Sequence, residues 1–355
     1  MPIRIAIALT VCSLFGQTPA PAPSTPPKSP FIRGPFEFSG VVDGYFSHNG
    51  NSPDSKFNAV RNFDTQANRP ALNMARLAIS SASGPVGFRV DIGGGRAFNT
   101  LHATEVNLGN SVMRHIPQAY VTFKPAGWNG VTLDFGKFYT SAGAELTETH
   151  LNWNYSRSLL FALGPYYHFG ARLTAPVNKT WTTGFHLING WNNVNDLNDG
   201  KTMGFTNSFN LGKLTLSNAY YTGPEKIGPA KGWRNFADTV LAYRVDERTS
   251  LLFNYDYGTE ANVNGKRGQF QGFAGAARVQ VTKKIAFSPR VEVYQDRDGV
   301  TSGTPQNLKE VTLTGEYRIN EWMISRLEFR RDASNQPYFD RGAGVANAKS
   351  QNTLL

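Results

Sequence analysis

Apolar and polar residues alternate along most of this chain, from about Phe36 to its last residues. In the run over 310–319, Val311 and Leu313 fall on one face of an extended strand, and Glu316 and Arg318 fall on the other. Alternation with a period of two predicts β-strands. About sixteen such runs follow one another, so the expected fold class is all-β.

The connections between these runs alternate between long and short. The long ones take about ten to twenty-seven residues and the short ones about one to four. This two-sided asymmetry is typical of an antiparallel up-and-down barrel in an outer membrane, with long outer loops and short periplasmic turns. The expected fold is therefore a transmembrane β-barrel of about sixteen strands.

Charged residues recur on the polar face of strand after strand. A dry core with water outside, or lipid outside with a wet lumen, would each accept such strands. An export leader and the loop asymmetry favour the lipid-facing barrel. Its predicted lumen wall comprises Arg76, Arg89, Asp91, His168, Arg172, Arg290, Glu316, Arg318, Arg326, Glu328 and Arg330.

Aromatic residues gather near both ends of the predicted strands. Two aromatic girdles at the two membrane interfaces would place them there, although ordinary β-propensity is an alternative. Those beside short turns are Trp128, Trp181 and Trp322, and those beside long loops are Trp191, Tyr221, Tyr257 and Tyr294.

The first 35 residues have a different composition. Residues 1–16 combine Arg4 with a short apolar stretch, which predicts a signal peptide cleaved somewhere within 16–20. A lipoprotein anchor on Cys12 is disfavoured because Val11 precedes it instead of a small residue. Residues 17–35 are rich in proline and predict a periplasmic linker before a barrel over 36–355.

The third outer loop, over 138–164, is the longest. Leu159, Leu160, Phe161 and Leu163 near its end make it less polar than a free loop should be. A loop with this composition is expected to fold inward and pack on the barrel wall.

The same region carries a family resemblance. The motifs are Gly-Lys-Phe at 136–138, Gly143 with Glu145, Asn-Tyr-Ser-Arg-Ser at 154–158, and Pro165 before His-Phe-Gly at 168–170. Together with Phe-Ser-Gly-Val-Val-Asp-Gly-Tyr at 38–45, they resemble the OmpL-like outer-membrane β-barrel porins over roughly 36–355. The resemblance implies a porin-like pore whose substrates are poorly defined.

By analogy with sixteen-stranded porins, the third loop would form the constriction, with Glu145, Glu148 and Arg157 at the narrow point. Facing arginines of the wall would then set up a transverse field that orders polar solutes. The alternative is that these charges pair with each other and pin the loop, and the two interpretations are compatible.

The charge distribution and the missing catalytic motifs argue against a nucleic-acid-binding protein and against an enzyme. The net charge of +10 is spread through the strands instead of forming a patch, which argues against nucleic acid as a partner. The sequence has no G-x-S-x-G, H-E-x-x-H or P-loop motif, and its six histidines lack ligand spacing. No cofactor, metal site or enzymatic activity is therefore expected.

The favoured function is passive diffusion of ions and small polar solutes through an outer-membrane porin. A substrate-selective channel and a non-conducting structural or adhesive barrel stay open as alternatives. The expected partners are outer-membrane lipid, the solutes and the barrel insertion machinery. Porin analogy adds a homotrimer, with the first outer loop over 49–69 as a candidate contact.

The last run, about six residues over 350–355, is short and lacks a terminal aromatic residue. The sequence leaves open whether it is a short closing strand, whether the barrel is partly open, or whether residues are missing.

Overall fold

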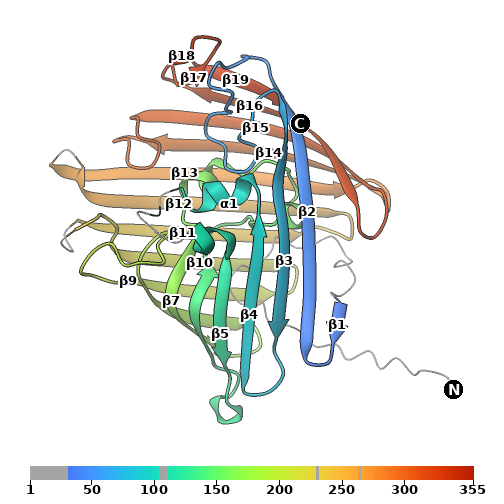
Figure 1. Cartoon of the computed structure of the whole chain (residues 1–355), viewed down its shortest axis with the longest axis vertical. Coiled ribbons are helices and arrows are strands. Elements are labelled where there is room, and N and C mark those ends of the chain that lie inside the picture. Colours follow the sequence, from blue (N-terminus) through green and yellow to red (C-terminus); the bar gives the residue numbers. More distant parts are fainter. Residues whose placement is uncertain (1–30, 104, 106–110, 229–231, 264) are drawn as a thin grey trace.

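The computed structural model describes residues 31–355 apart from 104, 106–110, 229–231 and 264. Their dominant feature is one large antiparallel sheet that closes on itself (Figure 1). Its strands are β1 (Phe31–Arg33), β2 (Phe36–Asn49), β3 (Arg69–Ser81), β4 (Val86–Gly94), β5 (Gln118–Phe123), β6 (Thr132–Tyr139), β7 (Tyr167–Pro176), β8 (Trp181–Ile188), β9 (Thr202–Leu211), β10 (Leu214–Pro224), β11 (Trp233–Arg244), β12 (Thr249–Val263), β13 (Lys266–Gln280), β14 (Ile285–Asp296), β15 (Gln306–Arg318), β16 (Ile324–Ser334) and β19 (Ser350–Leu354).

Each strand from β2 to β15 pairs with the next one along the chain, and β19 pairs with both β16 and β2. These sixteen strands form the ring, so the all-β up-and-down barrel is confirmed. The short β1 is an addition, because it pairs only with β2. A separate small hairpin joins β17 (Phe339–Asp340) to β18 (Ala346–Ala348).

Short helical turns lie in the connections. The two α-helices are α1 (Arg96–Leu101) and α2 (Leu159–Leu163), and the 3-10 turns are Ser111–His115, Ala126–Trp128 and Thr149–Leu151. Within the described part of the chain, no helix has the length and apolar character needed to cross a membrane.

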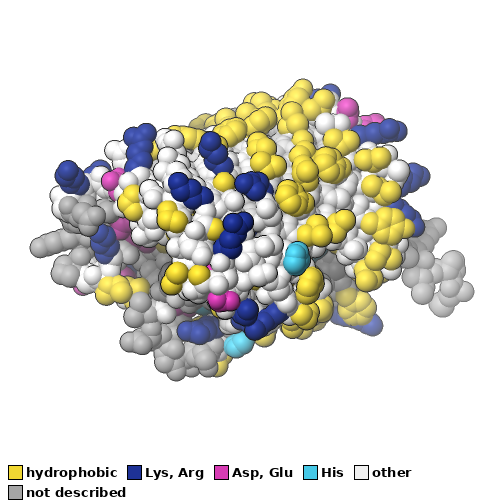
Figure 2. Space-filling model, turned by 90° about the horizontal axis from the view of Figure 1, so that it is seen from above, with side chains coloured by type: hydrophobic (Ala, Val, Ile, Leu, Met, Phe, Trp, Pro, Cys, Tyr) yellow, Lys and Arg dark blue, Asp and Glu magenta, His cyan; other side chains and the backbone are white. Residues whose placement is uncertain are grey.

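The alternation of the sequence becomes an alternation of burial. In β15 the side chain of Val311 is 43% exposed, whereas Thr312 and Thr314 are fully buried. Figure 2 shows hydrophobic side chains covering a broad zone of the outer surface, with Lys and Arg side chains on both sides of it. Apolar groups thus face outward and polar groups inward, the reverse of a water-soluble barrel.

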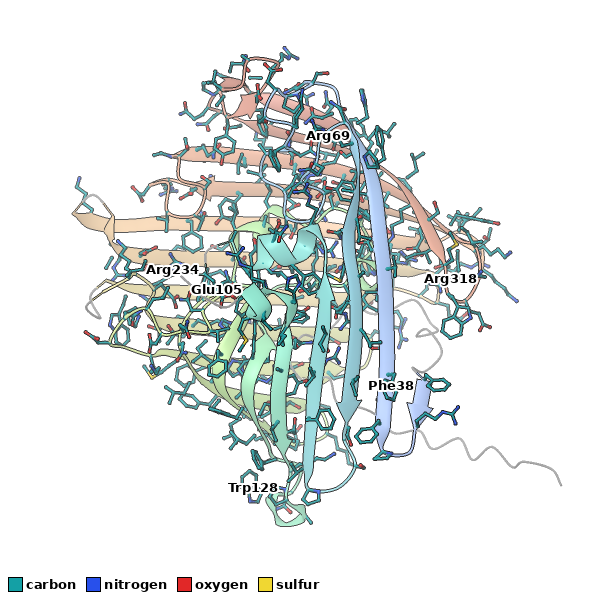
Figure 3. All side chains as sticks on the ribbon, viewed as in Figure 1. Phe38, Arg69, Glu105, Trp128, Arg234 and Arg318 are labelled. Atoms are coloured by element: carbon teal, nitrogen blue, oxygen red, sulfur yellow. The ribbon has the colours of Figure 1, made fainter. Side chains whose placement is uncertain are left out.

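The two ends of the barrel differ as expected. Trp128 and Arg318 lie at the end with the short turns, and Arg69, Glu105 and Arg234 lie toward the end with the long connections (Figure 3). One predicted long loop is absent, because β12 and β13 continue as a paired hairpin to Val263 and Lys266.

The predicted aromatic girdle at the long-loop end is partly wrong. Tyr257 is exposed, but Trp191, Tyr221 and Tyr294 are buried inside the barrel. Their apolar rings are needed there because the third outer loop brings hydrophobic side chains into the interior. At the other end, Trp128 and Trp322 are exposed.

The N-terminal expectations meet the structure only in part. The predicted signal peptide and most of the predicted linker lie outside the described residues. The last residues assigned to the linker are different, since Phe31–Arg33 forms β1 and pairs with Phe36, Glu37 and Phe38 of β2. Gly34 supplies the turn between them with a φ of 59°, a left-handed conformation that glycine adopts without strain.

Candidate functional site

The third outer loop, here called L3 (residues 140–166), lies inside the barrel. Ser158 is the N-cap of its α2, and the Ser158 hydroxyl accepts a hydrogen bond from the Phe161 amide at 3.0 Å. Leu159 and Leu160 on this helix are buried in an apolar cluster that includes wall residues of β13 and β14. The apolar end of the loop thus explains why it folds inward.

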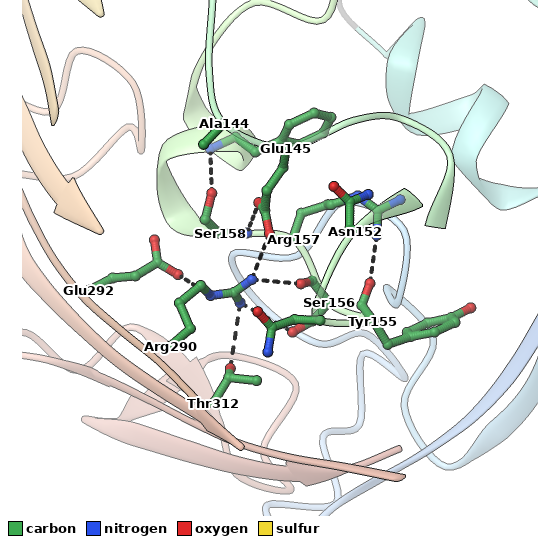
Figure 4. A network of polar contacts seen from close by, with 12 residues as sticks. Ala144, Glu145, Asn152, Tyr155, Ser156, Arg157, Ser158, Arg290, Glu292 and Thr312 are labelled. Carbon is green, nitrogen blue, oxygen red and sulfur yellow. Dashed lines mark hydrogen bonds and ion pairs between the residues drawn. The ribbon is translucent and has the colours of Figure 1, made fainter. Parts of the chain in front are cut away.

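The acidic start of L3 binds one arginine of β14. Arg290 donates to Glu145 and to the Ser156 carbonyl, each at 2.8 Å (Figure 4). The same guanidinium pairs with Glu292 at 2.9 Å and with Glu310 at 3.3 Å. Arg290 is buried, so these groups compensate the cost of removing its charge from water.

Neighbouring charges on β16 hold the backbone of L3. Glu328 accepts hydrogen bonds from the amides of Tyr155 and Ser156 at 2.6 and 2.9 Å. Arg326 donates to the Thr149 carbonyl at 2.7 Å, and Arg330 donates to the Arg157 carbonyl at 2.5 Å. Charge-assisted bonds to main-chain groups fix the path of the loop as well as its position.

The far side of L3 reaches β2 and β3. Glu148 pairs with Arg76 at 3.1 Å, and Arg76 also pairs with Asp91 at 2.5 Å. The Thr149 hydroxyl donates to Asp43 of β2 at 2.6 Å. L3 is therefore tied to β14–β16 and to β2–β3, which are neighbouring parts of the ring on either side of β19.

Arg157 has a different place from the one predicted. Its guanidinium donates to the carbonyls of Leu146, Thr147 and Tyr155 at 2.9, 2.7 and 2.6 Å. It lies over the Phe63 ring, 4.8 Å from the centroid, and the residue is 1% exposed. Arg157 thus organises the loop from inside instead of presenting its charge to a solute.

The other predicted wall residues have inward positions without reaching Glu145 or Glu148. Arg89 pairs with Asp91, Arg172 pairs with Asp134 at 2.7 Å, and Glu316 lies between Arg278 and Arg326. His168 contacts the Thr140 hydroxyl at 3.0 Å, at the very start of L3. Arg318 is half-buried near the short-turn end of β15.

Aromatic residues contact L3 from the strands β6–β11. His168 stacks on Tyr221 with centroids 4.9 Å apart, and Trp191 packs edge-on to Phe236 at 5.0 Å. Tyr221, Trp191 and Phe236 belong to the apolar cluster that also contains Leu159 and Leu160 of L3. This side of the interior is filled by rings where the opposite side is filled by ion pairs.

The first outer loop, here called L1 (residues 50–68), also turns inward. Arg61 donates to Asp332 of β16 at 2.9 Å, and Phe63 packs edge-on to Phe161 of L3 at 5.8 Å. The trimer contact predicted for 49–69 is thus largely occupied within the same chain, and exposed groups such as Phe57 lie near its tip.

Several residues of this network were missed from the sequence. Glu292 and Asp332 have the same strand parity as Arg290 and Arg330, so extending the alternation by one step would have found them. Glu310 lies on the polar face of the run over 310–319 but is not among the predicted wall residues. Arg61 gave no such signal, because a loop has no periodicity that assigns a side chain to a face.

A half-buried carboxylate joins two outer connections. Glu225 follows β10 and accepts hydrogen bonds from the Trp191 amide and the Thr202 hydroxyl, each at 2.7 Å. Burial raises the pKa of Glu225 to about 7, against the opposing effect of Arg234. Among the described residues, no group of three His, Cys, Asp or Glu side chains is arranged to hold a metal.

Comparison with known proteins gives one family. The model described as "putative beta-barrel porin-2, OmpL-like" matches residues 35–355. A search of curated protein sequences found no match.

Solved outer-membrane barrels have a similar structure. The anion-selective porin from Comamonas acidovorans superposes with a TM-score of 0.59 at 11% identity, over 90% of this chain and 97% of that chain. The outer-membrane channel DcaP of Acinetobacter baumannii gives 0.58 at 9% identity, over 92% and 98%. OmpT of Vibrio cholerae gives 0.57 at 10% identity, over 91% and 98%. Identities this low show a shared fold.

Proposed function

Because the chain belongs to the OmpL-like β-barrel porin-2 family, we propose that it is an outer-membrane channel whose constriction is L3. Ions and small polar solutes diffuse through the part of the interior that L3 leaves to water. The short turns face the periplasm and the long connections face outside, as in other barrels of this kind.

The observation that carries this proposal is the anchoring of L3 on two walls. Arg290 of β14 binds Glu145, and Arg76 of β3 binds Glu148. L3 leaves the ring at β6 and returns at β7, and β14 lies on the far side of the ring from both. These ion pairs therefore hold the loop across the interior and reduce the cross-section of the barrel at that level.

The wall on the periplasmic side of L3 carries hydroxyl side chains, which supports the proposal that the solute is polar. Thr182, Thr206, Ser208 and Ser217 lie at inward positions of β8–β10 and are half-buried. Hydroxyl groups exchange hydrogen bonds with water or a solute without holding it tightly. Since the carboxylates of L3 are already paired with arginines, we expect weak ion preference and low conductance.

The packing of the interior favours a second candidate, a barrel that does not conduct. Phe138, Tyr221 and Phe236 are buried at the level of L3, where an open porin would have water. Such a barrel would act through its outer surface or its loops. Conductance separates the two candidates directly.

The test is single-channel conductance of the refolded protein in planar bilayers, beside the double variant Glu145→Gln and Glu148→Gln. The isosteric amides remove the negative charges of the loop. Arg290 still pairs with Glu310 and Arg76 still pairs with Asp91, so L3 is released without leaving a buried arginine unpaired. We expect small discrete steps from the unaltered protein and larger steps from the variant.

The matched control is Glu247→Gln in the exposed turn after β11, which should leave the steps unchanged. A folded, heat-modifiable barrel without steps in every variant would overturn the diffusion proposal. A current that one solute reduces in a saturable way would instead identify a substrate-selective channel.

A further inference from the structure

Two cations lie on the outward face of the barrel, just beyond its apolar zone. On β15, Lys309 follows the outward-facing Val311 toward the end with the long connections, and on β16 Arg331 follows Phe329 in the same way. Both Lys309 and Arg331 are exposed. In the orientation proposed above, they lie where the hydrocarbon of the membrane meets the headgroups of the outer leaflet.

Strand register makes these two cations neighbours. Lys309 pairs with Ala333 of β16, and Arg331 pairs with Val311 of β15. They are therefore diagonal partners on one face of an antiparallel pair, with a separation of about 7–8 Å. Long side chains reach across such a separation, so the ammonium and the guanidinium can contact a single group between them.

No carboxylate compensates these charges on the same face. Within the described residues, the outward positions of β14, β15, β16 and β19 carry no Asp or Glu side chain. Arg331 donates to Asn352 Oδ1 at 2.9 Å and to Ser350 Oγ at 3.4 Å, and both acceptors are uncharged. These contacts hold the guanidinium against β19 and leave its positive charge available to an anion.

The adjoining part of the outer surface is neutral near the same level. The Tyr255 hydroxyl donates to Gln271 at 3.1 Å, and Gln271 donates to Gln295 of β14 at 2.8 Å. This row ends beside β15, where Lys309 and Arg331 begin. Figure 2, which views the molecule from the side of β15, β16 and β19 in Figure 1, shows Lys and Arg side chains grouped at the border of the hydrophobic zone. The positive charge is thus local to these strands.

An apolar surface adjoins the two cations. Val293 pairs with Lys309 across β14 and β15, and Val291 pairs with Val311. Val293 and Val291 are 48% and 52% exposed, and Phe329 on β16 is 41% exposed. A ligand that uses both parts of this surface has an anionic group joined to a hydrocarbon chain, which describes a lipid better than a free anion.

We propose that Lys309 and Arg331 form a binding site for the phosphate group of a lipid of the outer leaflet. The guanidinium offers two parallel N–H donors to phosphate oxygens, and the ammonium adds a point charge. The acyl chains lie along Val291, Val293 and Phe329. The site is on the outer surface of the barrel, so it does not depend on conduction through the interior.

Native mass spectrometry of the refolded protein in an uncharged detergent tests this site. The probes are lipid A with its two phosphates, the same lipid after removal of its phosphates, and inorganic phosphate. We expect the unaltered barrel to retain lipid A. The double variant Lys309→Gln with Arg331→Gln should need at least tenfold more lipid A for the same occupancy. Both side chains are exposed, so the variant should stay a heat-modifiable barrel.

The matched control is Lys283→Gln with Lys284→Gln, which removes the same charge from the exposed short turn after β13 and should leave lipid A occupancy unchanged. An equal loss in this control would overturn the proposal, because net charge alone would explain it. Equal retention of the dephosphorylated lipid, or no retention of lipid A by a heat-modifiable barrel, would also overturn it. Inorganic phosphate bound as tightly as lipid A would overturn it by identifying a site for the free anion.

Discussion

L3 is held by two contrasting regions of the same barrel. On β14–β16 it meets charged groups, with Arg290, Arg326 and Arg330 bound to its carboxylate and carbonyls. On β6–β11 it meets rings, including Tyr221 and Trp191. The charged region fixes direction and register, because each bond needs a particular partner. The aromatic region fills volume and excludes water.

The difference teaches how a membrane barrel can bury a loop in a polar interior. Ion pairs alone barely offset the cost of removing charges from water. Apolar contacts on the opposite side supply the driving force, and the charged contacts choose one arrangement among several. If this division is right, variants of the two regions should both loosen L3 but should differ in their effect on ion preference.

The largest effect is expected from Arg290→Met. It leaves Glu145, Glu292 and Glu310 buried around an uncharged side chain, which should cost about 4 kcal/mol of unfolding free energy. Urea unfolding of the refolded barrel measures this cost. Conductance should rise, and the reversal potential in a salt gradient should shift toward cations because a positive charge is lost.

Arg244→Met, at the exposed end of β11, is the matched control. If it destabilises the barrel as much as Arg290→Met does, the charged network has no special role in holding L3.

Leu160→Ala tests the apolar cluster that Leu160 shares with Tyr221 and Trp191, and should cost about 3 kcal/mol. Leu160 is 2% exposed and packs closely on β13, where a Cβ built on Gly272 would lie 2.9 Å from its Cδ1. Conductance should rise because L3 loosens, while the reversal potential should stay unchanged because no charge is altered. A shift as large as that of Arg290→Met would remove the distinction between the two regions.

The sequence predicted the charged region far better than the aromatic one. Period-two alternation assigns Arg290, Glu328 and Arg330 to the inward face of their strands, and a long acidic loop supplies Glu145, the partner of Arg290. The same alternation marks Tyr221 as an aromatic strand-end residue, which is equally compatible with a girdle. The Tyr221 ring lies inside the barrel because L3 folds inward and brings apolar side chains there, which the alternation does not show.

The contacts made by the loops could not be predicted from the sequence for a related reason. Arg61 and Phe63 of L1 meet Asp332 and Phe161, residues about 270 and 100 positions away along the chain. No local sequence pattern encodes such pairs, because they depend on which distant parts of the chain the closed barrel brings together.

A smaller and more local effect concerns pH and Glu225. Its pKa is raised to about 7 by burial, so the folded form keeps its proton where the unfolded form, near 4.5, has lost it. The stability of this contact is fully present below pH 4.5 and is lost as the pH rises through 7. Hydrogen exchange at the Trp191 amide, corrected for intrinsic rate, should therefore show local opening that is easier by about 2 kcal/mol at pH 8 than at pH 4.5.

Glu225→Gln should make that local stability independent of pH, since an amide has no proton to lose in this range. Persistence of the pH dependence in the variant would assign it to another group.

The smallest effect is expected from Tyr221→Phe, which probes whether the aromatic region acts through packing or through hydrogen bonds. The hydroxyl accepts from the Ser141 amide at 3.4 Å and lies 3.3 Å from His186 Nδ1, both long contacts. The variant keeps the ring that stacks on His168 at 4.9 Å, so its cost should be about 1 kcal/mol or less. Urea unfolding beside Leu160→Ala provides the comparison. A cost equal to that of Leu160→Ala would mean that polar bonds hold L3 on this side as well, and the contrast between a packed wall and a charged wall would fail.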